Sequence, residues 1–364
     1  MVRKAFGMRP LDFHDTESTR ETPGVDTFLL GTGSALPTQI IDSAVLEERL
    51  DLAPGALVDA FQVKSRHWSR PLDGRRPVAG EACSDLAAEA GRRALESCGL
   101  APRDIDLLVV ASSTPDFINP SLDYLVGAKL GLGSCLRFTI QAPCTGLFRS
   151  LVLVDALLRV GRAHNALVIA AETISPFFSL DATGPLDQRL SAGLYADGAG
   201  AVVVSSQGDR GRLLFAESTT HFSEDPPGIF FPGRLSARPD GPADGSLRDE
   251  VGYQDFRRVL RRGGELTARA VRIGLDRARW SASAVDKFLT HQATGGIKRI
   301  ADLHGLPGEK FPVNIGHVGN TISASILILM DELAREESFT SGERIILATA
   351  ESSSWSSGSA AVIW

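Results

Sequence analysis

Short apolar runs alternate with amphipathic windows along the chain from residue 27 onward. Residues 28–31 form an apolar run that ends at a glycine, which predicts a buried strand followed by a turn. Residues 86–98 (LAAEAGRRALESC) carry apolar side chains at helical spacing and predict an amphipathic helix. Residues 105–111 (IDLLVVA) are apolar and β-branched over the length of one strand, as in a sheet covered on both faces. This alternation predicts an α/β fold.

The same order of elements occurs twice, because the chain contains an internal repeat. Laid without gaps, the two copies pair Leu86 with Leu266, Leu95 with Leu275, and Asp106 with Asp286. A second pairing follows each copy: FTIQAPCTG from residue 138 corresponds to FPVNIGHVGN from residue 311, and a long apolar helix comes after each. Apolar runs that end at Glu172 and Glu351 complete the repeat. Helix, strand, strand, helix and strand therefore recur, which predicts two fused α/β units with two quasi-equivalent sheets.

We divide the chain accordingly into a polar leader, an N-terminal half and a C-terminal half, at residues 1–26, 27–206 and 207–364. The leader lacks the apolar stretch of a signal peptide. Residues 221–254 are dense in Pro, Gly, Asp and Arg, which indicates an insertion of low order at the surface. A second interpretation of this insertion is a lid that closes over an apolar substrate through Ile229, Phe230 and Phe231.

The composition narrows the class of protein. The chain has 364 residues, 43% of them hydrophobic, and can bury a large core without disulfides or metals. Its four Cys form no C-x-x-C pair, which argues against a disulfide framework and a zinc site. The formal net charge of −6 argues against general nucleic-acid binding, and no apolar run approaches the ~18 residues of a membrane-spanning helix. We expect a reduced cytoplasmic protein with no metal and no nucleic-acid or membrane partner.

Cys144 differs from the other cysteines in its position. Cys83 and Cys98 lie in or beside an amphipathic helix and Cys135 in a Gly-rich turn, where a small buried residue is the simpler interpretation. Cys144 follows a predicted strand (137–141) and precedes a long apolar helix. The unpaired N–H groups at the start of that helix favour thiolate over thiol, which makes Cys144 a candidate nucleophile. The structural alternative is a small residue that begins a buried helix.

Two polar residues of the C-terminal half are candidate partners of this nucleophile. His291 ends a predicted strand (288–290), and the repeat brings the strand ends of both halves to a common cleft, where it is expected to meet Cys144. His317 lies at the position that the repeat makes equivalent to Cys144. Asn320, before a long helix, is a candidate donor to a developing oxyanion. Its structural alternative is a helix N-cap.

Four motifs occur in register on this duplicated chain: A-P-C-T-G (142–146), A-D-G-A-G (196–200), H-Q-A (291–293) and G-N-T (319–321). In that order and spacing they resemble the thiolase superfamily, and most closely its β-ketoacyl-acyl-carrier-protein synthase III branch. The similarity runs from about residue 28 to residue 364. It implies the five-layered αβαβα thiolase-like fold, which agrees with the internal repeat, and a homodimer.

The resemblance also implies a chemistry. Cys144 accepts the acyl group of a thioester, while His291 and Asn320 stabilise the enolate formed when a malonyl-type extender loses carbon dioxide. The oxyanion is held by the backbone N–H of Cys144 and by a second N–H from the loop near Ser353. Condensation then releases a β-ketoacyl thioester. The expected partners are an acyl carrier protein or acyl-coenzyme A, with no other cofactor.

The chain departs from the family pattern at the C-terminal loop and at the coenzyme A site. The loop, Gly-rich in the family, reads E-S-S-S-W (351–355), and Thr294 stands where typical members often have Asn. Ala56 and Ala60 lie where primary-metabolism members tend to have a Trp and an Arg that grip the coenzyme A adenine. Because the stacking ring and the guanidinium are missing, we expect the acyl donor to arrive on a carrier protein, in fatty-acid-like or polyketide metabolism.

Two further groups of residues are candidates for substrate or carrier docking. Lys298 and Arg299, on the helix that follows H-Q-A, suit an acidic carrier protein, although a solvated helix face explains them equally well. Phe117 and Asn119 lie in the loop 116–120, where head-to-head condensing relatives place a carboxylate before a Pro. Asn119 at that position argues against long-chain condensation without decarboxylation, whereas the carboxylate of Asp116 nearby leaves this reaction open.

Decarboxylative condensation is the first functional hypothesis. The alternative is acyl transfer, in which the acyl group passes from Cys144 to a hydroxyl, amine or thiol with His291 as general base. Asn320 distinguishes the two hypotheses in part. Its implied task is to stabilise an enolate, and acyl transfer alone forms no enolate, so its presence favours condensation. Two other functions explain the sequence less well. A subunit that only binds acyl groups and has no catalytic role would not need both Cys144 and His291. A Cys hydrolase unrelated to thiolases would not contain the internal repeat.

Overall fold

The computed structural model describes residues 26–364 except 75, 223–225, 231–252 and 304. Residues 1–25 of the predicted leader and most of the predicted insertion therefore lie outside the described residues. Of the suggested lid, Phe231 also lies outside them. The domain bounds expected from the repeat stay a prediction.

Nine strands form the main sheet, and their order mirrors the internal repeat. In chain order they are β1 (Thr27–Ala35), β4 (Leu107–Ala111), β5 (Leu136–Ile140), β6 (Asn165–Glu172), β7 (Gly198–Ser205), β8 (Arg212–Thr220), β11 (Lys287–Thr290), β12 (Arg344–Glu351) and β13 (Ser356–Ile363). Across the sheet, the N-terminal half runs β5, β4, β6, β7, β1, and the C-terminal half continues as β8, β13, β12, β11. The first four strands counted outward from the middle thus correspond between the halves.

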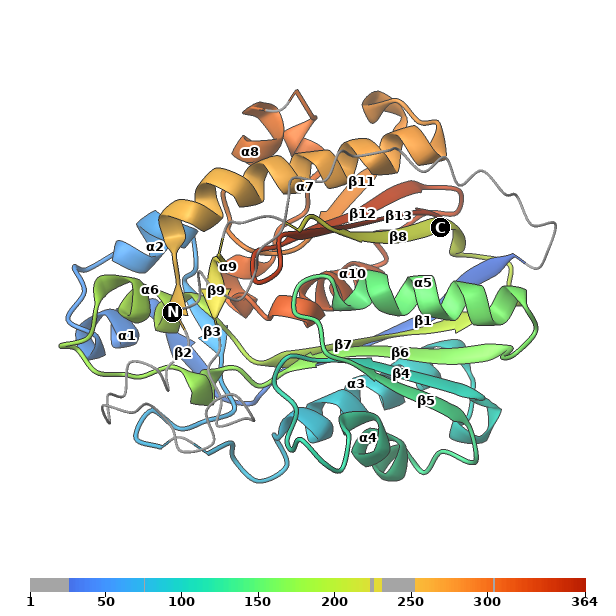
Figure 1. Cartoon of the computed structure of the whole chain (residues 1–364), viewed down its shortest axis with the longest axis horizontal. Coiled ribbons are helices and arrows are strands. Elements are labelled where there is room, and N and C mark those ends of the chain that lie inside the picture. Colours follow the sequence, from blue (N-terminus) through green and yellow to red (C-terminus); the bar gives the residue numbers. More distant parts are fainter. Residues whose placement is uncertain (1–25, 75, 223–225, 231–252, 304) are drawn as a thin grey trace.

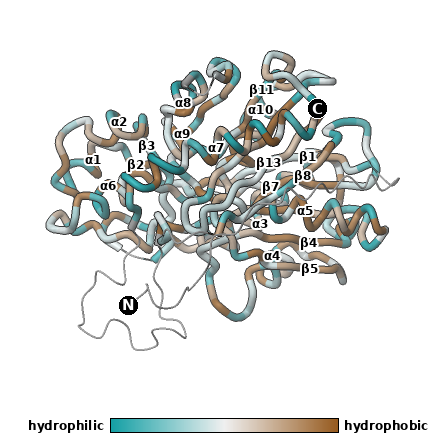
Figure 2. The backbone as a smooth tube through the Cα atoms, turned by 45° about the horizontal axis from the view of Figure 1, so that its top comes forward, coloured by the Kyte–Doolittle hydropathy of each residue, from teal (hydrophilic) through white to brown (hydrophobic). Residues whose placement is uncertain are grey.

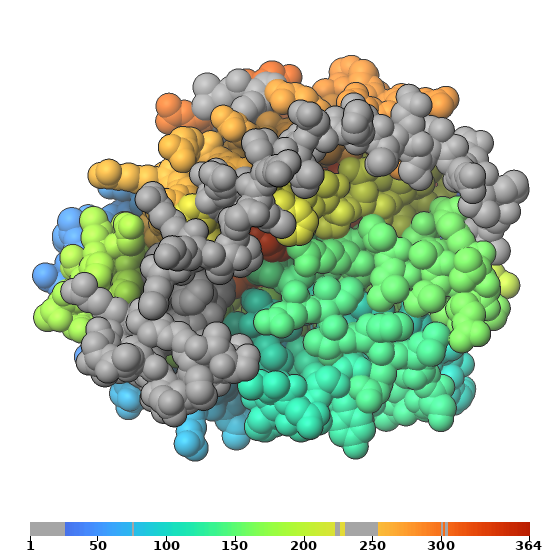
Figure 3. All heavy atoms as spheres, viewed as in Figure 1, coloured from blue at the N-terminus to red at the C-terminus, as the bar shows by residue number. Residues whose placement is uncertain are grey.

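Helices cover both faces of each half of the sheet, which gives five layers (Figure 1). Two helices lie between the half-sheets, α5 (Gly146–Arg159) and α10 (Ser325–Arg335). The outer helices are α7 (Phe256–Ala278) and α8 (Ile297–Leu303) on the C-terminal strands, and α3 (Cys83–Cys98) and α4 (Leu122–Leu130) on the N-terminal strands. In Figure 3 the orange surface of α7 accordingly lies above the green surface of the N-terminal half. The predicted αβαβα layering is confirmed.

The middle layer contains a large apolar core. α5 buries Leu147, Phe148, Leu151 and Val154, and seven consecutive residues at the start of α10 are buried. A helix packed between two sheets needs apolar side chains on more than one face, which explains why both helices read as apolar in the sequence. In Figure 2, the strands β4 and β5 of the N-terminal half of the sheet have the brown colour of hydrophobic residues. None of the described helices has the length and apolar character needed to cross a bilayer.

The first strand is longer than predicted. β1 continues past Gly31 to Ala35, so the expected glycine turn at residue 31 is wrong. The strand pairs with β7 along most of its length, and a Cβ atom at Gly33 would lie 2.3 Å from the carbonyl oxygen of Ala90 in α3. Glycine is needed here because α3 approaches the strand closely, and no turn is involved.

The repeat is incomplete at the edge of the C-terminal half. The segment from Phe311, predicted as a strand, forms no strand in the described structure. Its polar groups bind a side chain instead: Gln292 donates to the carbonyl of Pro312 at 3.4 Å and accepts the N–H of Asn314 at 3.1 Å. The Phe311 ring stacks on Phe288 at 4.7 Å, and Pro312 has no N–H to give to a strand ladder.

The two predicted sheets are joined into one. Thr27 and Phe28 of β1 pair with Leu213 and Arg212 of β8, at one end of both strands. Beyond this point the two halves separate and enclose the middle helices (Figure 1). The two quasi-equivalent sheets are therefore two halves of one hydrogen-bonded sheet.

Smaller elements build a lobe at one end of the sheet. Two-stranded ladders pair β2 with β3 and β9 with β10. The lobe elements are β2 (Ile40–Asp42), α1 (Ser43–Arg49), α2 (Ala56–Phe61), β3 (Ser65–His67), α6 (Leu186–Leu194), β9 (Ile229–Phe230), β10 (Tyr253–Gln254) and α9 (Ile315–Val318). A buried apolar cluster joins this lobe to Cys144 through Trp68, Phe178 and Tyr195.

Candidate active site

A cavity of about 330 Å³ lies where the lobe meets both halves of the sheet. Cys144, His291 and Asn320 all line it, so the structure brings together the three residues predicted from the sequence. Most of the remaining wall is apolar and includes Phe61, Leu194, Phe256, Val259 and Ile322. Side chains from both halves meet at this wall, since the rings of Phe61 in α2 and Phe256 in α7 lie 5.3 Å apart.

Cys144 is buried at the start of α5. Thr145 is the N-cap of the helix, and Gly146 is its first residue. A Cβ atom at Gly146 would lie 2.8 Å from the Cβ atom of Ala111, so glycine allows the helix to begin this close to β4. The carbonyl of Cys144 accepts a hydrogen bond from the hydroxyl of Thr349 in β12 at 3.2 Å. The thiol is thus held between the two halves.

The expectation that the helix end favours the thiolate is wrong for this structure. Burial raises the pKa of the Cys144 thiol well above its ordinary value, and the nearby carboxylates of Glu351 and Glu172 raise it further. One of the N–H groups at the start of the helix, that of Thr145, donates to the carboxylate of Glu351. Cys144 is therefore a thiol in the resting protein.

His291 follows β11 and is also buried. Its backbone N–H donates to the carbonyl of Ala348 in β12 at 3.1 Å, and its Nδ1 atom lies 2.7 Å from the hydroxyl oxygen of Ser325 in α10. Burial lowers the pKa of the imidazole to about 4. The ring is neutral near pH 7 as a result.

Asn320 faces the cavity from a tight connection before α10. Its side-chain Oδ1 accepts the N–H of Ile322 at 3.0 Å, which leaves its NH₂ group available to a ligand. Gly319 has a φ of 84°, and a Cβ atom there would lie 2.6 Å from the Cβ atom of Ala196. Gly319 therefore has to be glycine for Asn320 to lie against the A-D-G-A-G segment. There, Ala196 donates its backbone N–H to the Asn320 carbonyl at 2.9 Å.

The C-terminal loop is the tip of the hairpin formed by β12 and β13. Glu351 and Ser356 are the last paired residues, and residues 352–355 form the tip. Ser352 and Ser353 line the cavity together with Glu351. At the far side of the tip, the indole N–H of Trp355 donates to the carbonyl of Pro226 at 3.1 Å. The structure thus places Ser353 at the wall of the predicted site.

Sequence reasoning missed several polar residues, one near Cys144 and others at the cavity wall. Glu172, at the end of β6, accepts hydrogen bonds from Thr114 and Ser323, both at 2.7 Å, and burial raises its pKa to about 7. The hydroxyl of Tyr195 donates to the side-chain oxygen of Gln254 at the cavity wall. The repeat pointed to Glu172 and Glu351 only as strand ends, and no motif marks the other residues.

The predicted docking residues lie outside the cavity wall. Lys298 and Arg299 are exposed on α8, directly after Ile297, which does line the cavity. Phe117 and Asn119 are exposed in the loop between β4 and α4 and do not line it. Their roles stay predictions.

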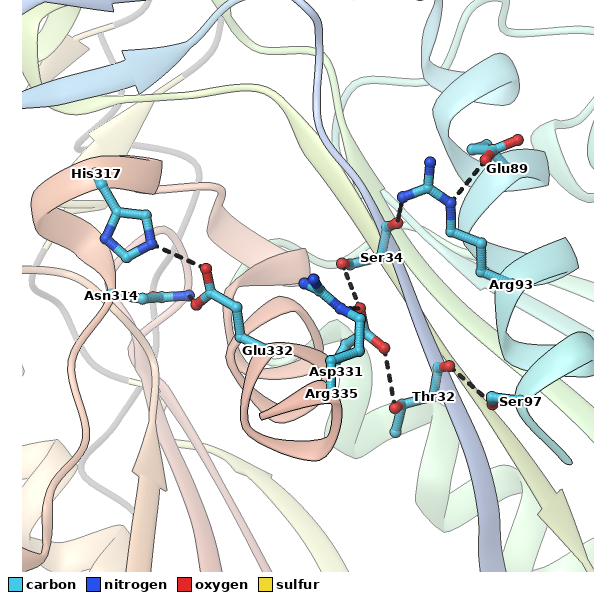
Figure 4. Close-up of polar contacts among 10 residues, drawn as sticks. All are labelled: Thr32, Ser34, Glu89, Arg93, Ser97, Asn314, His317, Asp331, Glu332 and Arg335. Atoms are coloured by element: carbon cyan, nitrogen blue, oxygen red, sulfur yellow. Dashed lines mark hydrogen bonds and ion pairs between the residues drawn. The ribbon is translucent and has the colours of Figure 1, made fainter. Parts of the chain in front are cut away.

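Of the other positions discussed from the sequence, some line the cavity and some do not. Ala60 and Thr294 line the cavity, as does Ile229 of the suggested lid. Ala56 lies one turn before Ala60 in α2. His317 is mostly exposed and binds Glu332 at 2.9 Å, away from the cavity (Figure 4).

Two family models match the chain. That of 3-oxoacyl-[acyl-carrier-protein (ACP)] synthase III matches residues 138–221, and that of the C-terminal part of the same enzyme matches residues 275–364. β-Ketoacyl-[acyl-carrier-protein] synthase III 3 of Streptomyces coelicolor is 34% identical over 346 residues, which cover 92% of this chain and 96% of that protein. Both matches confirm the resemblance stated from the motifs.

Solved structures agree with the sequence comparison. A 3-oxoacyl-(acyl carrier protein) synthase III from Pseudomonas aeruginosa has a TM-score of 0.79 at 29% identity, over 93% of this chain and 98% of that one. The priming β-ketosynthase of the R1128 polyketide pathway shares the fold, with a TM-score of 0.78 at 23% identity over 95% and 98% of the two chains. The chain therefore belongs to the β-ketoacyl-[acyl-carrier-protein] synthase III family of condensing acyltransferases, with a thiolase-like fold.

Proposed function

We propose that this enzyme takes an acyl group from a thioester onto Cys144 and condenses it with a malonyl-type thioester, with loss of carbon dioxide, to give a β-ketoacyl product. The observation that carries the proposal is the meeting of Cys144, His291 and Asn320 at one largely apolar cavity. Transfer of the acyl group to a simple nucleophile needs a thiol and a base but no enolate, so it leaves Asn320 without a task.

The first step is acylation of Cys144. The sulfur attacks the thioester carbonyl, the carbon–sulfur bond of the donor breaks, and the thiol proton leaves with the departing thiol. The developing oxyanion is held by the backbone N–H groups of Cys144 and Ser353. Cys144 and Ser353 both line the cavity, which supports this assignment.

The second step is condensation. The bond from the malonyl carboxylate to the α-carbon breaks, and the electron pair forms an enolate. Ser325 accepts the N–H of Gln292 at 3.3 Å and can give its own hydrogen to Nδ1 of His291, which places a hydrogen on Nε2. Nε2–H and the NH₂ group of Asn320 then donate to the enolate oxygen. The α-carbon attacks the acyl group and expels the Cys144 sulfur as a thiolate, which takes up a proton from solvent and returns to the resting thiol.

The acyl donor is proposed to arrive on a carrier protein. The cavity wall includes Ala60 and the exposed Leu260, and neither side chain can stack on an adenine or pair with a phosphate. Lys298 and Arg299 are exposed on α8, directly after Ile297 of the cavity wall, and suit an acidic partner.

The enzyme is further proposed to act as a homodimer in the cytoplasm. β5 is an edge strand of the sheet, and its Leu136 and Phe138 are 37% and 38% exposed. A second copy that pairs with this edge would cover both side chains and the unpaired backbone groups. The cytoplasmic location rests on the Cys usage of the chain.

Intact-mass measurement after exposure to acyl-carrier protein, followed by malonyl-carrier protein, tests the proposed function. Wild type is expected to gain the acyl mass and then to lose it with release of carbon dioxide and formation of a β-ketoacyl-carrier protein. Cys144→Ala is expected to gain no mass. Cys83→Ala is the matched control, because Cys83 is equally buried but does not line the cavity, and it should behave as wild type.

Other results would redirect or remove the proposal. An adduct that is released only by an alcohol, an amine or a thiol, without loss of carbon dioxide, would establish acyl transfer instead. No adduct with carrier-bound and coenzyme A-bound donors would contradict both functions.

A further inference from the structure

Glu351 links the hairpin tip to the helix that begins after Cys144. It is the last residue of β12 and is 2% exposed. Its Oε2 atom accepts the backbone N–H of Thr145 at 3.0 Å and also the Thr145 hydroxyl. Its Oε1 atom accepts the hydroxyls of Ser353, at 2.9 Å, and of Ser354. One carboxylate therefore ties both proposed oxyanion segments together.

The environment of this carboxylate is unusual for a structural residue. Its guanidinium partner is Arg149, whose Nη2 atom lies 3.9 Å from Oε1, beyond hydrogen-bonding distance. The second carboxylate near Cys144 is Glu172, and the imidazole of His291 is neutral. A buried carboxylate costs free energy unless hydrogen bonds and a helix N-terminus stabilise it, and Glu351 has both.

The sequence of the tip fits this linkage. The family resemblance gives a Gly-rich tip, which has no side chain that a carboxylate could hold. In this chain, Ser353 and Ser354 supply hydroxyl donors at the positions where Glu351 accepts them. The glutamate and the serines form one unit, and the tip gains fixed anchors.

We propose that Glu351 is a positioning residue that clamps the hairpin tip to the start of α5 and so fixes the separation of the Cys144 and Ser353 backbone N–H groups. This proposal rests on the proposed function, because it assigns those N–H groups to the oxyanion. The clamp has an electrostatic cost, since its negative charge lies close to the thiol and opposes the thiolate. Removal of the charge should therefore make Cys144 more reactive toward a simple alkylating agent and the enzyme less active.

Two measurements on the full chain test the clamp. The first is the rate of Cys144 alkylation by iodoacetamide against pH, followed by intact mass with peptide mapping. The second is steady-state turnover with acyl- and malonyl-carrier protein. For Glu351→Ala we expect alkylation at lower pH than wild type, and a kcat lower by about 10- to 100-fold with KM unchanged, because the oxyanion donors are misplaced.

Conservative variants separate charge from geometry. Glu351→Gln keeps an oxygen for the Thr145 N–H and loses the charge, so alkylation should shift as in Glu351→Ala while kcat falls less. Glu351→Asp keeps the charge, but its side chain is one methylene shorter and cannot contact both the helix start and the hairpin tip. The pH dependence of alkylation should therefore match wild type, while kcat falls. These two variants decide the question if Glu351→Ala does not fold.

Asp331→Asn is the matched control. Asp331 is a carboxylate that is 4% exposed and does not line the cavity; it accepts hydrogen bonds from Thr32 at 3.0 Å, Ser34 at 2.6 Å and Arg335 at 3.0 Å (Figure 4). The Asp331→Asn variant should change neither the alkylation profile nor kcat.

A wild-type kcat in Glu351→Ala, or in both Glu351→Gln and Glu351→Asp, would overturn the clamp. Failure of wild type to become acylated would instead overturn the proposed function, while the alkylation profile would still report the charge of Glu351.

Discussion

The Nδ1 atom of His291 lies 2.7 Å from the hydroxyl oxygen of Ser325, the first residue of α10. This contact joins the end of β11 to a helix of the middle layer and fixes the ring orientation. The same oxygen accepts the backbone N–H of Gln292, so the hydroxyl hydrogen is free to point at the ring. Ser325 lies outside the cavity wall, and a hydroxyl hydrogen given to Nδ1 would leave the ring hydrogen on Nε2.

Loss of this hydroxyl should impair the condensation step more than the acylation step. Ser325→Ala removes one hydrogen bond to the ring that donates to the enolate, which we expect to slow decarboxylation of malonyl-carrier protein by about tenfold. Release of labelled carbon dioxide measures it. Ser325→Thr keeps the hydroxyl and should retain most of the rate. Equal slowing of Cys144 acylation in the Ala variant would contradict a role confined to the enolate.

The motif residues were predictable from sequence, and their hydrogen-bond partners were not. Cys144, His291 and Asn320 lie in short patterns at the ends of repeated strands, so the duplication alone suggests that they meet. Ser325 lies in no such pattern, and its contact with His291 spans 34 positions of sequence. The repeat marks Glu172 only as a strand end, and its contact with Ser323 spans 151 positions. Such contacts depend on the packing of helices between half-sheets, which periodicity does not report.

The error about the thiolate has a similar cause. A helix that begins after Cys144 is readable from the sequence, and its N-terminal field is a general property of helices. That a carboxylate 206 positions away accepts the first N–H is not readable. The sequence showed the charge of Glu351 and its place in the loop, but only the fold shows that it faces the helix end.

Burial of His291 should make stability depend on pH. Its folded pKa is lowered to about 4, whereas an unfolded chain has a His pKa near 6.5. Between these values the unfolded state binds more protons, so the folded state loses stability as the pH falls. From pH 7 to pH 5 this single site contributes a loss of about 2 kcal/mol. Urea unfolding of His291→Gln at the two pH values should lack this loss, and an unchanged pH dependence would contradict the burial argument.

Glu172 should have the opposite effect. Burial raises its folded pKa to about 7 from an ordinary value of 4.5, so between these values the folded state binds more protons. The folded state therefore gains stability as the pH falls, by about 2 kcal/mol from pH 7 to pH 5. The two residues offset each other in wild type. Glu172→Gln should therefore become less stable relative to wild type at pH 5, whereas a gain at pH 5 would refute the assigned sign.

The basic pair on α8 should matter only for carrier-bound donors. Lys298→Glu combined with Arg299→Glu reverses two exposed charges that follow Ile297 of the cavity wall, and we expect KM for acyl-carrier protein to rise at least about tenfold. KM for an acyl-coenzyme A thioester should stay unchanged. Arg103→Glu, an exposed charge of the 3₁₀ turn before β4, is the control. Equal KM changes for both donors would place the effect in the cavity and not at a docking surface.

The exposed edge of β5 gives the test of the homodimer. Phe138 is 38% exposed in the middle of an edge strand, whose burial pattern is unlike that of the fully buried β4 beside it. An open edge with apolar side chains is a template for pairing with a second copy. Phe138→Asp places a charge in that contact and should yield monomers in sedimentation velocity experiments. Val160→Asp changes a side chain that is 69% exposed at the end of α5 and should leave the dimer intact. A monomeric wild type, or a dimer that survives Phe138→Asp, would show that β5 is not the interface.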